Sequence, residues 1–385
     1  MRALTETSGD GSRAWGGTPT PYEAWVRRQG VPIYEGYGLT DLNLPEFGYW
    51  DRIGAEAYFS IMRGMEGITG MYVARLPAGG QTKRERHLYE KVVYVLAGAG
   101  TTLIEDPSGK EHTFEWHEGS LFAIPLNRPH QFFAMGEGAR YVAFTTAPLV
   151  FDLFYNEEFI YNTPFPFSER FDGESDYFKL DQRRPRGQGG EYESYLWETN
   201  FIPDVRMAQI DPSERKGPGL LLTQFEIASN SLIGHLAEWP VGRYVKAHYH
   251  GGGAILLIVK SVGYSLMWPN DLGERPYANG NGDGVIRIDW QPGSVFSPPT
   301  GWYHQHFNTG PERALQLALR NGSAKFPFGV RRAQTKNGVM TSTAEGGTMI
   351  DFEDEDPIIR RDYLAALARN GVTSDMPDIV ARARR

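Results

Sequence analysis

The stretch WHEGSLFAIPLNRPHQFF, residues 116–133, aligns without a gap with WQPGSVFSPPTGWYHQHF, residues 290–307. Eight of the eighteen positions are identical. Upstream of each copy, a histidine-containing segment leads into an apolar strand and a glycine turn: RERHLYEKVVYVLAGAG from Arg84 and KAHYHGGGAILLIVKSVG from Lys246. Self-similarity in the same order along the chain indicates that one structural unit occurs twice.

Several short runs outside this repeat have the composition of β-strands. Residues 140–147, 219–227, 285–290 and 314–320 are rich in β-branched and aromatic side chains and are bounded by Gly, Pro, Asn and Asp. The 45 glycines and 25 prolines among 385 residues supply many turns. Short strands with regular turns predict sandwiches or barrels, so the expected fold class is all-β with two tandem barrels.

Composition and charge exclude several classes of function. The sequence has 39 Lys and Arg residues against 47 Asp and Glu residues, and its one short basic run is Arg183, Arg184 and Arg186. Nucleic acid is therefore not an expected partner. No stretch has the length of an apolar membrane span, and the N-terminal residues lack an apolar signal core, which predicts a cytoplasmic protein without a membrane partner. The absence of cysteine excludes thiolate sites, so a metal would need histidines and carboxylates.

The repeat also sets expected domain boundaries. We expect an N-terminal extension over 1–50, a first barrel over 51–150, an inter-barrel connection over 151–218, a second barrel over 219–325 and a C-terminal extension over 326–385. A short helix is predicted in the last segment, because Asp356 can cap it, Pro357 suits its first position and Gly371 can end it.

The second half carries two spaced motifs. His248 and His250 follow Gly242 and are separated from each other by one residue; further on stand Gly293, Pro299, Gly301, His304 and Asn308. With these residues the sequence resembles the cupin superfamily, whose motifs are G-x5-H-x-H-x3,4-E-x6-G and G-x5-P-x-G-x2-H-x3-N. The resemblance implies two jelly-roll barrels of the double-stranded β-helix type, and a metal held by the motif histidines and glutamate.

The two halves differ in their expected metal ligands. In the second half the glutamate position falls on Ala254 or Ile255, which would leave His248, His250 and His304 as a three-histidine site. The resemblance associates that variant with non-haem iron dioxygenases, so the expected cofactor is one divalent metal, Fe(II) first, with Mn, Ni or Zn as alternatives.

The first half has a degraded motif. The alignment puts Glu85 on the first histidine, His87 on the second, Lys91 on the glutamate and His130 on the last ligand. A lysine ammonium group disfavours a cation electrostatically, so no metal is expected here unless Glu85 or Glu90 compensates. The candidate vestigial site therefore consists of Glu85, His87, Glu90 and His130.

Residues near the second-half motifs are candidates for binding and catalysis. Alternation along a strand puts His248 and His250 on one face, and His306 on the same face as His304. His306 and Tyr303 are candidate acid–base groups by position. Aromatic and polar neighbours are candidate substrate contacts, namely Arg243, Tyr249, Trp268, Trp302 and Asn308.

The leading functional prediction is an Fe(II) dioxygenase that cleaves a C–C bond of a small oxygenated substrate, aromatic or enolisable, with O2 as co-substrate. The resemblance extends distantly to ring-cleaving bicupins of the gentisate 1,2-dioxygenase type, although those usually carry the working metal in the first barrel. A non-oxidative Mn, Ni or Zn isomerase, lyase or hydrolase is the first alternative, and a non-catalytic small-molecule-binding bicupin is the second. Association into a homo-oligomer is left open.

Overall fold

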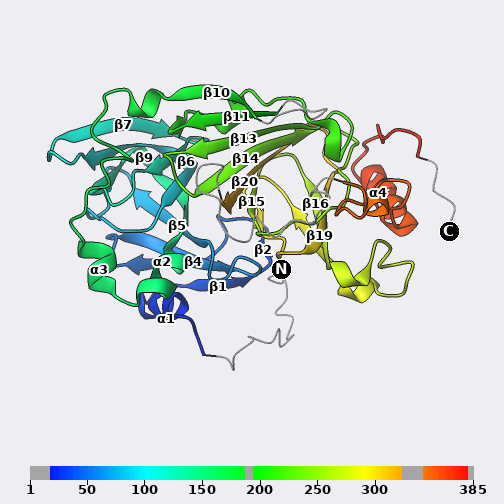
Figure 1. The fold of residues 1–385 in the computed structure, drawn as a ribbon, viewed down its shortest axis with the longest axis horizontal. Helices are drawn as coiled ribbons and strands as arrows, with labels where there is room; N and C mark the ends of the chain where they lie inside the picture. The colour runs from blue at the N-terminus through cyan, green and yellow to red at the C-terminus, as the bar shows by residue number, and fades with distance from the viewer. Residues whose placement is uncertain (1–17, 187–193, 323–340, 380–385) are drawn as a thin grey trace.

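The computed structural model describes residues 18–186, 194–322 and 341–379. Two curled β-structures lie beside each other, the first drawn from blue to cyan and the second from green to yellow (Figure 1). Residues 1–17 and 326–340, which belong to the predicted terminal extensions, lie outside the described residues, as do 187–193 and 380–385. The predicted all-β class with two barrels is confirmed.

The first barrel is one sheet in the order β1-β4-β5-β9-β6-β8-β12, with β3 on β4 and β7 on β6. Its strands are β1 (Ile33–Gly36), β3 (Gly48–Trp50), β4 (Ala55–Met62), β5 (Gly70–Pro77), β6 (Lys91–Glu105), β7 (Glu111–His117), β8 (Leu121–Ile124) and β9 (His130–Thr145).

The long strands β6 and β9 bend where their register shifts, near Val95 and Gly98. Gly98 has φ +80°, and a Cβ there would lie 2.0 Å from the carbonyl oxygen of Gly138, so glycine is required. This bulge lets the two long strands curl, which allows a single sheet to form the barrel.

The second barrel has two sheets. One has the order β10-β11-β13-β14-β20-β15-β18-β2 and the other has the order β17-β16-β19. The strands are β10 (Asp181–Arg186), β11 (Ser194–Thr199), β13 (Leu221–Ile227), β14 (Leu232–Trp239), β15 (Ile255–Lys260), β16 (Gly263–Pro269), β17 (Ile286–Trp290), β18 (Val295–Phe296), β19 (Trp302–Asn308) and β20 (Ala314–Asn321). The pairs β15/β16 and β19/β20 thus take the places of the bent strands β6 and β9.

The repeat seen in the sequence is confirmed by equivalent contacts. Trp116 is the penultimate residue of β7, which pairs with β6, and its indole Nε1 donates to Thr102 Oγ1 at 2.9 Å. Trp290 ends β17, and its Nε1 donates to Ser265 Oγ at 3.1 Å. The same residue therefore makes the same cross-strand hydrogen bond in both barrels.

Short strands are exchanged between the barrels. In the N-terminal segment, β1 runs parallel to β4 of the first barrel, whereas β2 (Gly38–Leu39) pairs with β18 of the second. In the connection, β11 runs parallel to β13 of the second barrel, whereas β12 (Phe201–Ile202) pairs with β8 of the first. Ser120 Oγ donates to the carbonyl of Pro203, directly after β12, and Ser294 Oγ donates to the carbonyl of Thr40, directly after β2. The N-terminal segment and the connection therefore have the same arrangement, and we call β2 and β12 the exchanged arms.

Buried groups also join the barrels. The Glu90 carboxylate accepts hydrogen bonds from the Ser231 amide and hydroxyl and from the Leu232 amide, all at 2.7–2.8 Å, where β14 begins. Phe225, Leu236 and other apolar residues of the second barrel belong to the same buried cluster as the core of the first. Glu90, proposed from the sequence as a ligand that could compensate for Lys91, instead fixes the second barrel to the first.

Helices cover the two ends. The helices α1 (Pro21–Arg28), α2 (Ala147–Phe154) and α3 (Glu157–Asn162) lie by the first barrel, and α4 (Pro357–Arg369) lies at the far end of the second (Figure 1). The Asp356 side chain accepts from the Ile358 amide, and Tyr363 donates to the carbonyl of Asn308 on β19. The predicted C-terminal helix and its cap are confirmed.

The remaining helical turns of the described residues are η1 (Tyr177–Lys179), η2 (Val205–Met207), η3 (Glu214–Lys216), η4 (Asn270–Leu272), η5 (Gly282–Gly284) and η7 (Thr343–Glu345).

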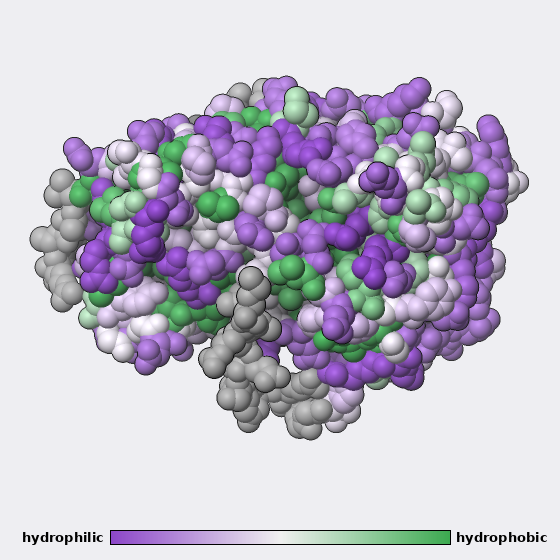
Figure 2. Space-filling view, turned by 180° about the vertical axis from the view of Figure 1, so that it is seen from behind, coloured by the Kyte–Doolittle hydropathy of each residue, from purple (hydrophilic) through white to green (hydrophobic). Residues whose placement is uncertain are grey.

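One face of the molecule is mostly hydrophilic (Figure 2). Figure 2 shows purple hydrophilic residues over much of one face, with smaller hydrophobic patches between them. Within the described ranges, none of the helices combines the length and apolar character needed to cross a bilayer.

Candidate metal centre

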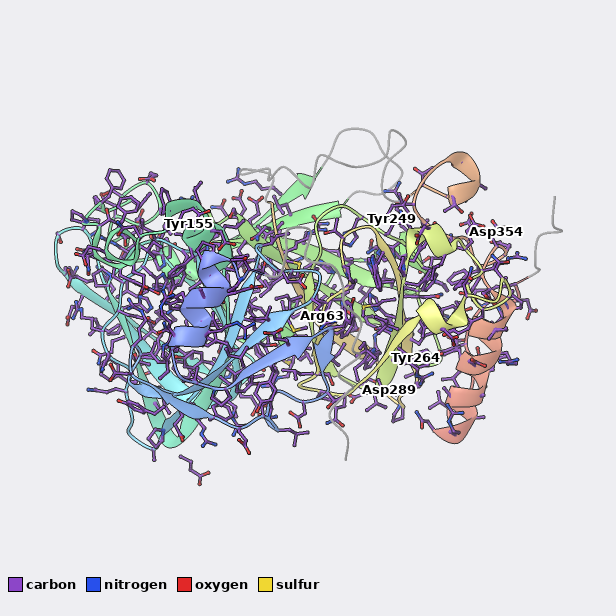
Figure 3. All side chains as sticks on the ribbon, turned by 90° about the horizontal axis from the view of Figure 1, so that it is seen from below. Arg63, Tyr155, Tyr249, Tyr264, Asp289 and Asp354 are labelled. Atoms are coloured by element: carbon purple, nitrogen blue, oxygen red, sulfur yellow. The ribbon has the colours of Figure 1, made fainter. Side chains whose placement is uncertain are left out.

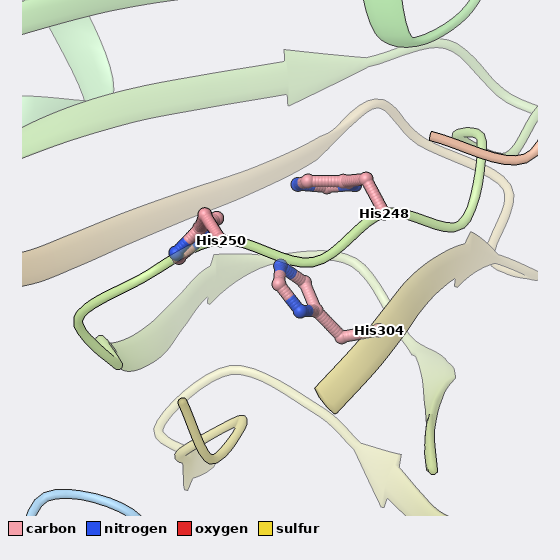
Figure 4. Close-up of side chains that lie close together, drawn as sticks. All are labelled: His248, His250 and His304. Atoms are coloured by element: carbon pink, nitrogen blue, oxygen red, sulfur yellow. The ribbon is translucent and has the colours of Figure 1, made fainter. Parts of the chain in front are cut away.

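His248, His250 and His304 come together inside the second barrel. The amide of His248 donates to the carbonyl of His304 at 3.2 Å, and the reverse hydrogen bond measures 2.9 Å. One ring nitrogen from each imidazole lies within 4.8 Å of the others, and the rings approach a common space (Figure 4). The segment with His248 and His250 is extended and joined by isolated bridges, where we expected a continuous strand. The predicted juxtaposition of the three rings is nevertheless present.

Backbone carbonyls orient all three imidazoles in the same way. The Nδ1 atoms of His248, His250 and His304 each lie 3.1 Å from a carbonyl oxygen two residues away in the chain. A carbonyl can only accept, so each Nδ1 carries the proton and each Nε2 keeps its lone pair. The Nε2 atom of His248 is buried and has no hydrogen-bond partner among the described residues. Three unprotonated Nε2 atoms are suitable ligands for one divalent cation.

Burial keeps these rings neutral. Burial, together with a smaller contribution from the cation Lys216, lowers the pKa of His304 to about 3. Burial also lowers the pKa values of His248 and His250 well below the ordinary value, with contributions from Lys216 and the other rings. Metal binding needs deprotonated imidazoles, so no proton has to leave this site at neutral pH. The residues therefore fit the metal that the sequence implies.

A small cavity of about 30 Å³ adjoins the three rings. Apolar side chains form much of its wall, including Leu222, Trp239 and Leu256. Ala254, which stands at the expected glutamate position, also lines it. Among the described residues that line this cavity, none is an Asp or a Glu.

Three polar residues of the cavity wall were not predicted from the sequence. They are Lys216, His235 and Gln316. Burial lowers the pKa of Lys216 to about 7, with a smaller contribution from Arg320. The Oε1 atom of Gln316 is buried without a hydrogen-bond partner. Strand alternation could have identified His235, because Ala237 and Trp239 on the same strand also line the cavity.

His306 presents a different tautomer. Its Nδ1 lies 2.8 Å from Ser265 Oγ, which already accepts a hydrogen bond from Trp290 Nε1. A hydroxyl oxygen can accept two hydrogen bonds, but the hydroxyl proton of Ser265 has no other acceptor among the described residues. We therefore assign this proton to the bond with Nδ1, and the proton of the ring to Nε2. Burial, followed by His304, lowers the pKa of His306 well below its ordinary value, so the ring is neutral. His306 lines the cavity and offers it an N–H donor, in keeping with its predicted position.

Three predicted aromatic candidates lie away from the cavity. Tyr303 is on the face of β19 opposite to His304, where it stacks on Trp268 at 5.4 Å and meets Tyr249 edge-on at 5.0 Å. The Trp268 indole donates to the carbonyl of Gly273. Tyr249 and Tyr264 appear in Figure 3 on the side of the second barrel that faces α4. Alternation along β19 gives the physical reason for this placement.

The remaining predicted contacts have other partners. Arg243 Nε donates to Asp375 at 2.8 Å, and Arg243 is not among the described residues of the cavity wall. The side chain of Asn308 is buried and hydrogen-bonded through both its oxygen and its nitrogen to neighbouring loops. The carbonyl of Trp302 accepts from His304 Nδ1, so Trp302 helps to orient a ligand.

The first barrel contains a second cluster, Glu85, His87 and His130, whose ligand atoms also lie within 4.8 Å of one another. The ammonium group of Lys91 lies among them and contacts both Glu85 and His130. This cluster does not fit a metal ion as it stands.

Comparison with known proteins agrees with the fold. Residues 72–145, within the first barrel, match the family model described as Cupin domain. The second barrel repeats the strand arrangement of the first and the segment 116–133, so the fold consists of two cupin-type barrels. A search of curated proteins gave no match.

Solved structures of oxalate decarboxylase are similar to this chain at low identity. One such structure has 15% identity and a TM-score of 0.47, and the match covers 73% of this chain and 76% of that chain. A variant of the Bacillus subtilis enzyme gives the same values. A structure titled for the Mn(II) centres of that enzyme has 16% identity and a TM-score of 0.46. The expected likeness to gentisate 1,2-dioxygenases stays a prediction.

Proposed function

We propose that the chain is a metal-dependent enzyme that acts on a small anionic, oxygen-rich substrate in the second cupin barrel. The observation that carries this proposal is the combination of three neutral histidines and Lys216 around a cavity whose described lining residues include no carboxylate. His248, His250 and His304 would hold the metal through Nε2. A bound divalent ion would supply Lewis acidity and a template for a substrate that chelates through two oxygens.

Charge balance favours an anionic substrate. Neutral imidazoles leave the charge of a divalent ion uncompensated, and protonated Lys216 adds to it. An unpaired buried charge is costly, so a carboxylate or enolate that enters the cavity is stabilised there. Lys216 can pair with one oxygen of such an anion, and it is placed on the wall by the turn that precedes β13.

The other polar residues can fix the substrate's orientation. The Nε2–H group of His306 can donate a hydrogen bond to a substrate oxygen and so stabilise negative charge that develops there. Gln316 offers an amide whose oxygen has no hydrogen-bond partner in the part of the chain that the structure describes. Leu222, Trp239 and Leu256 keep bulk water away from these groups, which strengthens their electrostatic interactions.

Cavity size argues against cleavage of an aromatic ring and thereby favours the alternative class, a lyase, isomerase or hydrolase with Mn, Ni or Zn. A cavity of about 150 Å³ accommodates benzene in a protein interior, whereas the volume beside these histidines is about 30 Å³. An aromatic substrate together with dioxygen would need considerably more space. A small aliphatic carboxylate is the better fit, so we place this class ahead of the ring-cleaving reaction predicted from the sequence.

One observation favours a second candidate. Ala254 stands where cupins commonly have a glutamate ligand, and a three-histidine set resembles that of non-haem iron dioxygenases. An Fe(II) enzyme that uses dioxygen to cleave a small enolisable substrate would also suit this cavity. A binding protein without catalysis would not need three unprotonated imidazole nitrogens that converge.

The test is elemental analysis of the purified protein, followed by separate reconstitution with Mn, Ni, Zn and, under anaerobic conditions, Fe(II). Each form is then assayed for substrate loss and oxygen uptake with small dicarboxylates, 2-oxo acids, β-diketones and gentisate. Turnover of an aliphatic acid without oxygen uptake is the expected result. Substrate-dependent oxygen uptake would favour the second candidate, and failure to bind any of the metals would refute the enzyme proposal.

A further inference from the structure

The centre of the first barrel corresponds to the metal centre of the second. Glu85 pairs with His130 through an isolated β-bridge, as His248 does with His304. The reciprocal hydrogen bonds between Glu85 and His130 measure 3.0 and 2.9 Å, close to those between the two histidines. Glu85 therefore stands where the second barrel has a metal-ligand candidate.

Lys91 stands at the position of Ala254. This equivalence follows from the register of β6 against β8 and of β15 against β18. In the second barrel Ala254 lines the open cavity, whereas in the first barrel the Lys91 side chain is fully buried. The lysine side chain thus extends into the region that is cavity in the other barrel.

The ammonium group of Lys91 contacts the ligand set directly. Its Nζ donates to the Glu85 carboxylate in a short hydrogen bond and to His130 Nε2 at 2.9 Å. The rings of Phe132 and Tyr72 surround it, with centroids at 5.6 and 5.9 Å from Nζ. A carboxylate, an imidazole lone pair and aromatic faces all favour a cation.

The two histidines here have the same tautomer as the metal-ligand candidates. His87 Nδ1 lies 2.8 Å from the Tyr89 carbonyl, and His130 Nδ1 lies 2.9 Å from the Arg128 carbonyl. Their Nε2 atoms therefore keep their lone pairs, and that of His87 is buried without a partner. The cluster has the donor chemistry of a site with two histidines and one carboxylate.

We infer that the Lys91 ammonium group takes the place of a metal ion in the first barrel, so that this barrel carries its own cation and excludes a divalent one. Its single positive charge balances Glu85. A metal ion at the same centre would meet a like charge and would compete for the nitrogen and oxygen atoms that the lysine already occupies. Removal of the lysine should therefore uncover a site for a divalent first-row metal.

The test compares Lys91→Ala with Lys83→Ala. The first change gives the first barrel the residue that the second has at this position, and the second removes an exposed lysine paired with Asp51 nearby. Each variant is also made in a His248→Ala background, so that metal in the second barrel does not contribute. Bound Co(II) is counted by elemental analysis and by its visible absorption during titration.

We expect Lys91→Ala to bind one more equivalent of Co(II) per chain than the parent, and Lys83→Ala to bind none in addition. The added change His130→Ala should remove the extra equivalent. Lys91→Ala without any gain, or a gain that survives His130→Ala, would overturn the inference.

A second comparison does not depend on the folding of Lys91→Ala, which leaves Glu85 buried without its lysine. His130→Ala in the otherwise wild-type chain should leave the metal content unchanged, because Lys91 keeps the first barrel free of metal. Loss of one equivalent in this variant would mean that the first barrel binds metal while Lys91 is present, and would refute the inference directly. These readings do not require activity, so they are independent of the proposed function.

Discussion

Ser265 Oγ and His306 Nδ1 lie 2.8 Å apart on the paired strands β16 and β19. Through this contact a serine that does not line the cavity determines which nitrogen of a cavity histidine carries the proton. The indole of Trp290 fixes the serine in turn. His306 therefore differs from the neighbouring metal-ligand candidates in the partner of its Nδ1 atom, because their Nδ1 atoms face backbone carbonyls.

We expect His306→Ala to lower kcat by roughly 100-fold, the lower range for loss of a hydrogen-bond donor to a developing negative charge. Metal content should not change, because His306 is not among the three converging ligands. Ser265→Ala should give a smaller loss of kcat and should alter its pH profile, because the tautomer is no longer fixed. His117→Gln, at an exposed position, serves as the control. A fall in metal content in His306→Ala would instead make this residue a ligand.

His248→Ala and His304→Ala should each abolish metal binding in the second barrel, and activity with it. Ala254→Lys should have the same effect without removal of any ligand, because it places an ammonium group where the first barrel has Lys91. Elemental analysis of each variant checks this. Full metal content in Ala254→Lys would show that the cavity position is not equivalent to that of Lys91.

Lys216 should make binding of an anionic substrate depend on pH. Burial lowers the pKa of its ammonium group to about 7, so the positive charge is present below that pH and is lost above it. KM for a carboxylate substrate should therefore rise as the pH increases through 7. Lys216→Met should raise KM about 10-fold at pH 6, the equivalent of about 1.4 kcal/mol, and abolish the pH dependence. An unchanged KM profile in Lys216→Met would place the anion elsewhere.

Glu355 should make the protein less stable at high pH. Burial raises the pKa of its carboxyl group from 4.5 to about 7, against the hydrogen bonds donated by Tyr244 and Gln305. The folded state therefore holds the proton more tightly than the unfolded state, and the free energy of unfolding falls as the pH rises from 4.5 through 7. The loss can reach about 3 kcal/mol. Chemical denaturation at pH 5 and pH 8 should show this slope, and Glu355→Gln should reduce it.

Glu90→Ala should destabilise the contact between the barrels. Three hydrogen bonds to the start of β14 would lose their charged acceptor, and the amides of Ser231 and Leu232 would be left buried. Loss of hydrogen bonds to a charged group costs about 3 kcal/mol. Thermal unfolding should show a lower midpoint, or separate transitions for the two barrels, while exposed Glu115→Ala should unfold like the wild type.

The repeat and the proximity of the three histidines were predictable because their signals are local in the sequence. His248 and His250 are two residues apart, and His304 follows at the spacing of a second motif, so the extended backbone brings all three candidates to one interior. The same rule, applied to neighbouring residues, would have placed Tyr303 on the opposite face from His304. It would also have identified His235 from the apolar residues that alternate with it.

Other features left no local signal. Lys216 reaches the cavity from a turn, where no periodicity indicates the direction of a side chain. The strands β2 and β12 have two residues each, and their pairing depends on a barrel far away in the chain. The sequence did indicate that Lys91 disfavours a metal, but only the structure shows its contacts with Glu85 and His130.

The exchanged arms have a consequence for how the two centres could come to differ. Each barrel receives β2 or β12 from the segment that belongs to its neighbour, an arrangement that two separate copies of one barrel could adopt by domain swapping. In such a symmetric dimer, any substitution would appear at both centres at once, and a lysine that displaced one ion would displace both. Duplication within a single gene removes that constraint, because each barrel then has its own sequence. One centre can then carry a lysine ammonium group while the other keeps the histidines that would bind a metal.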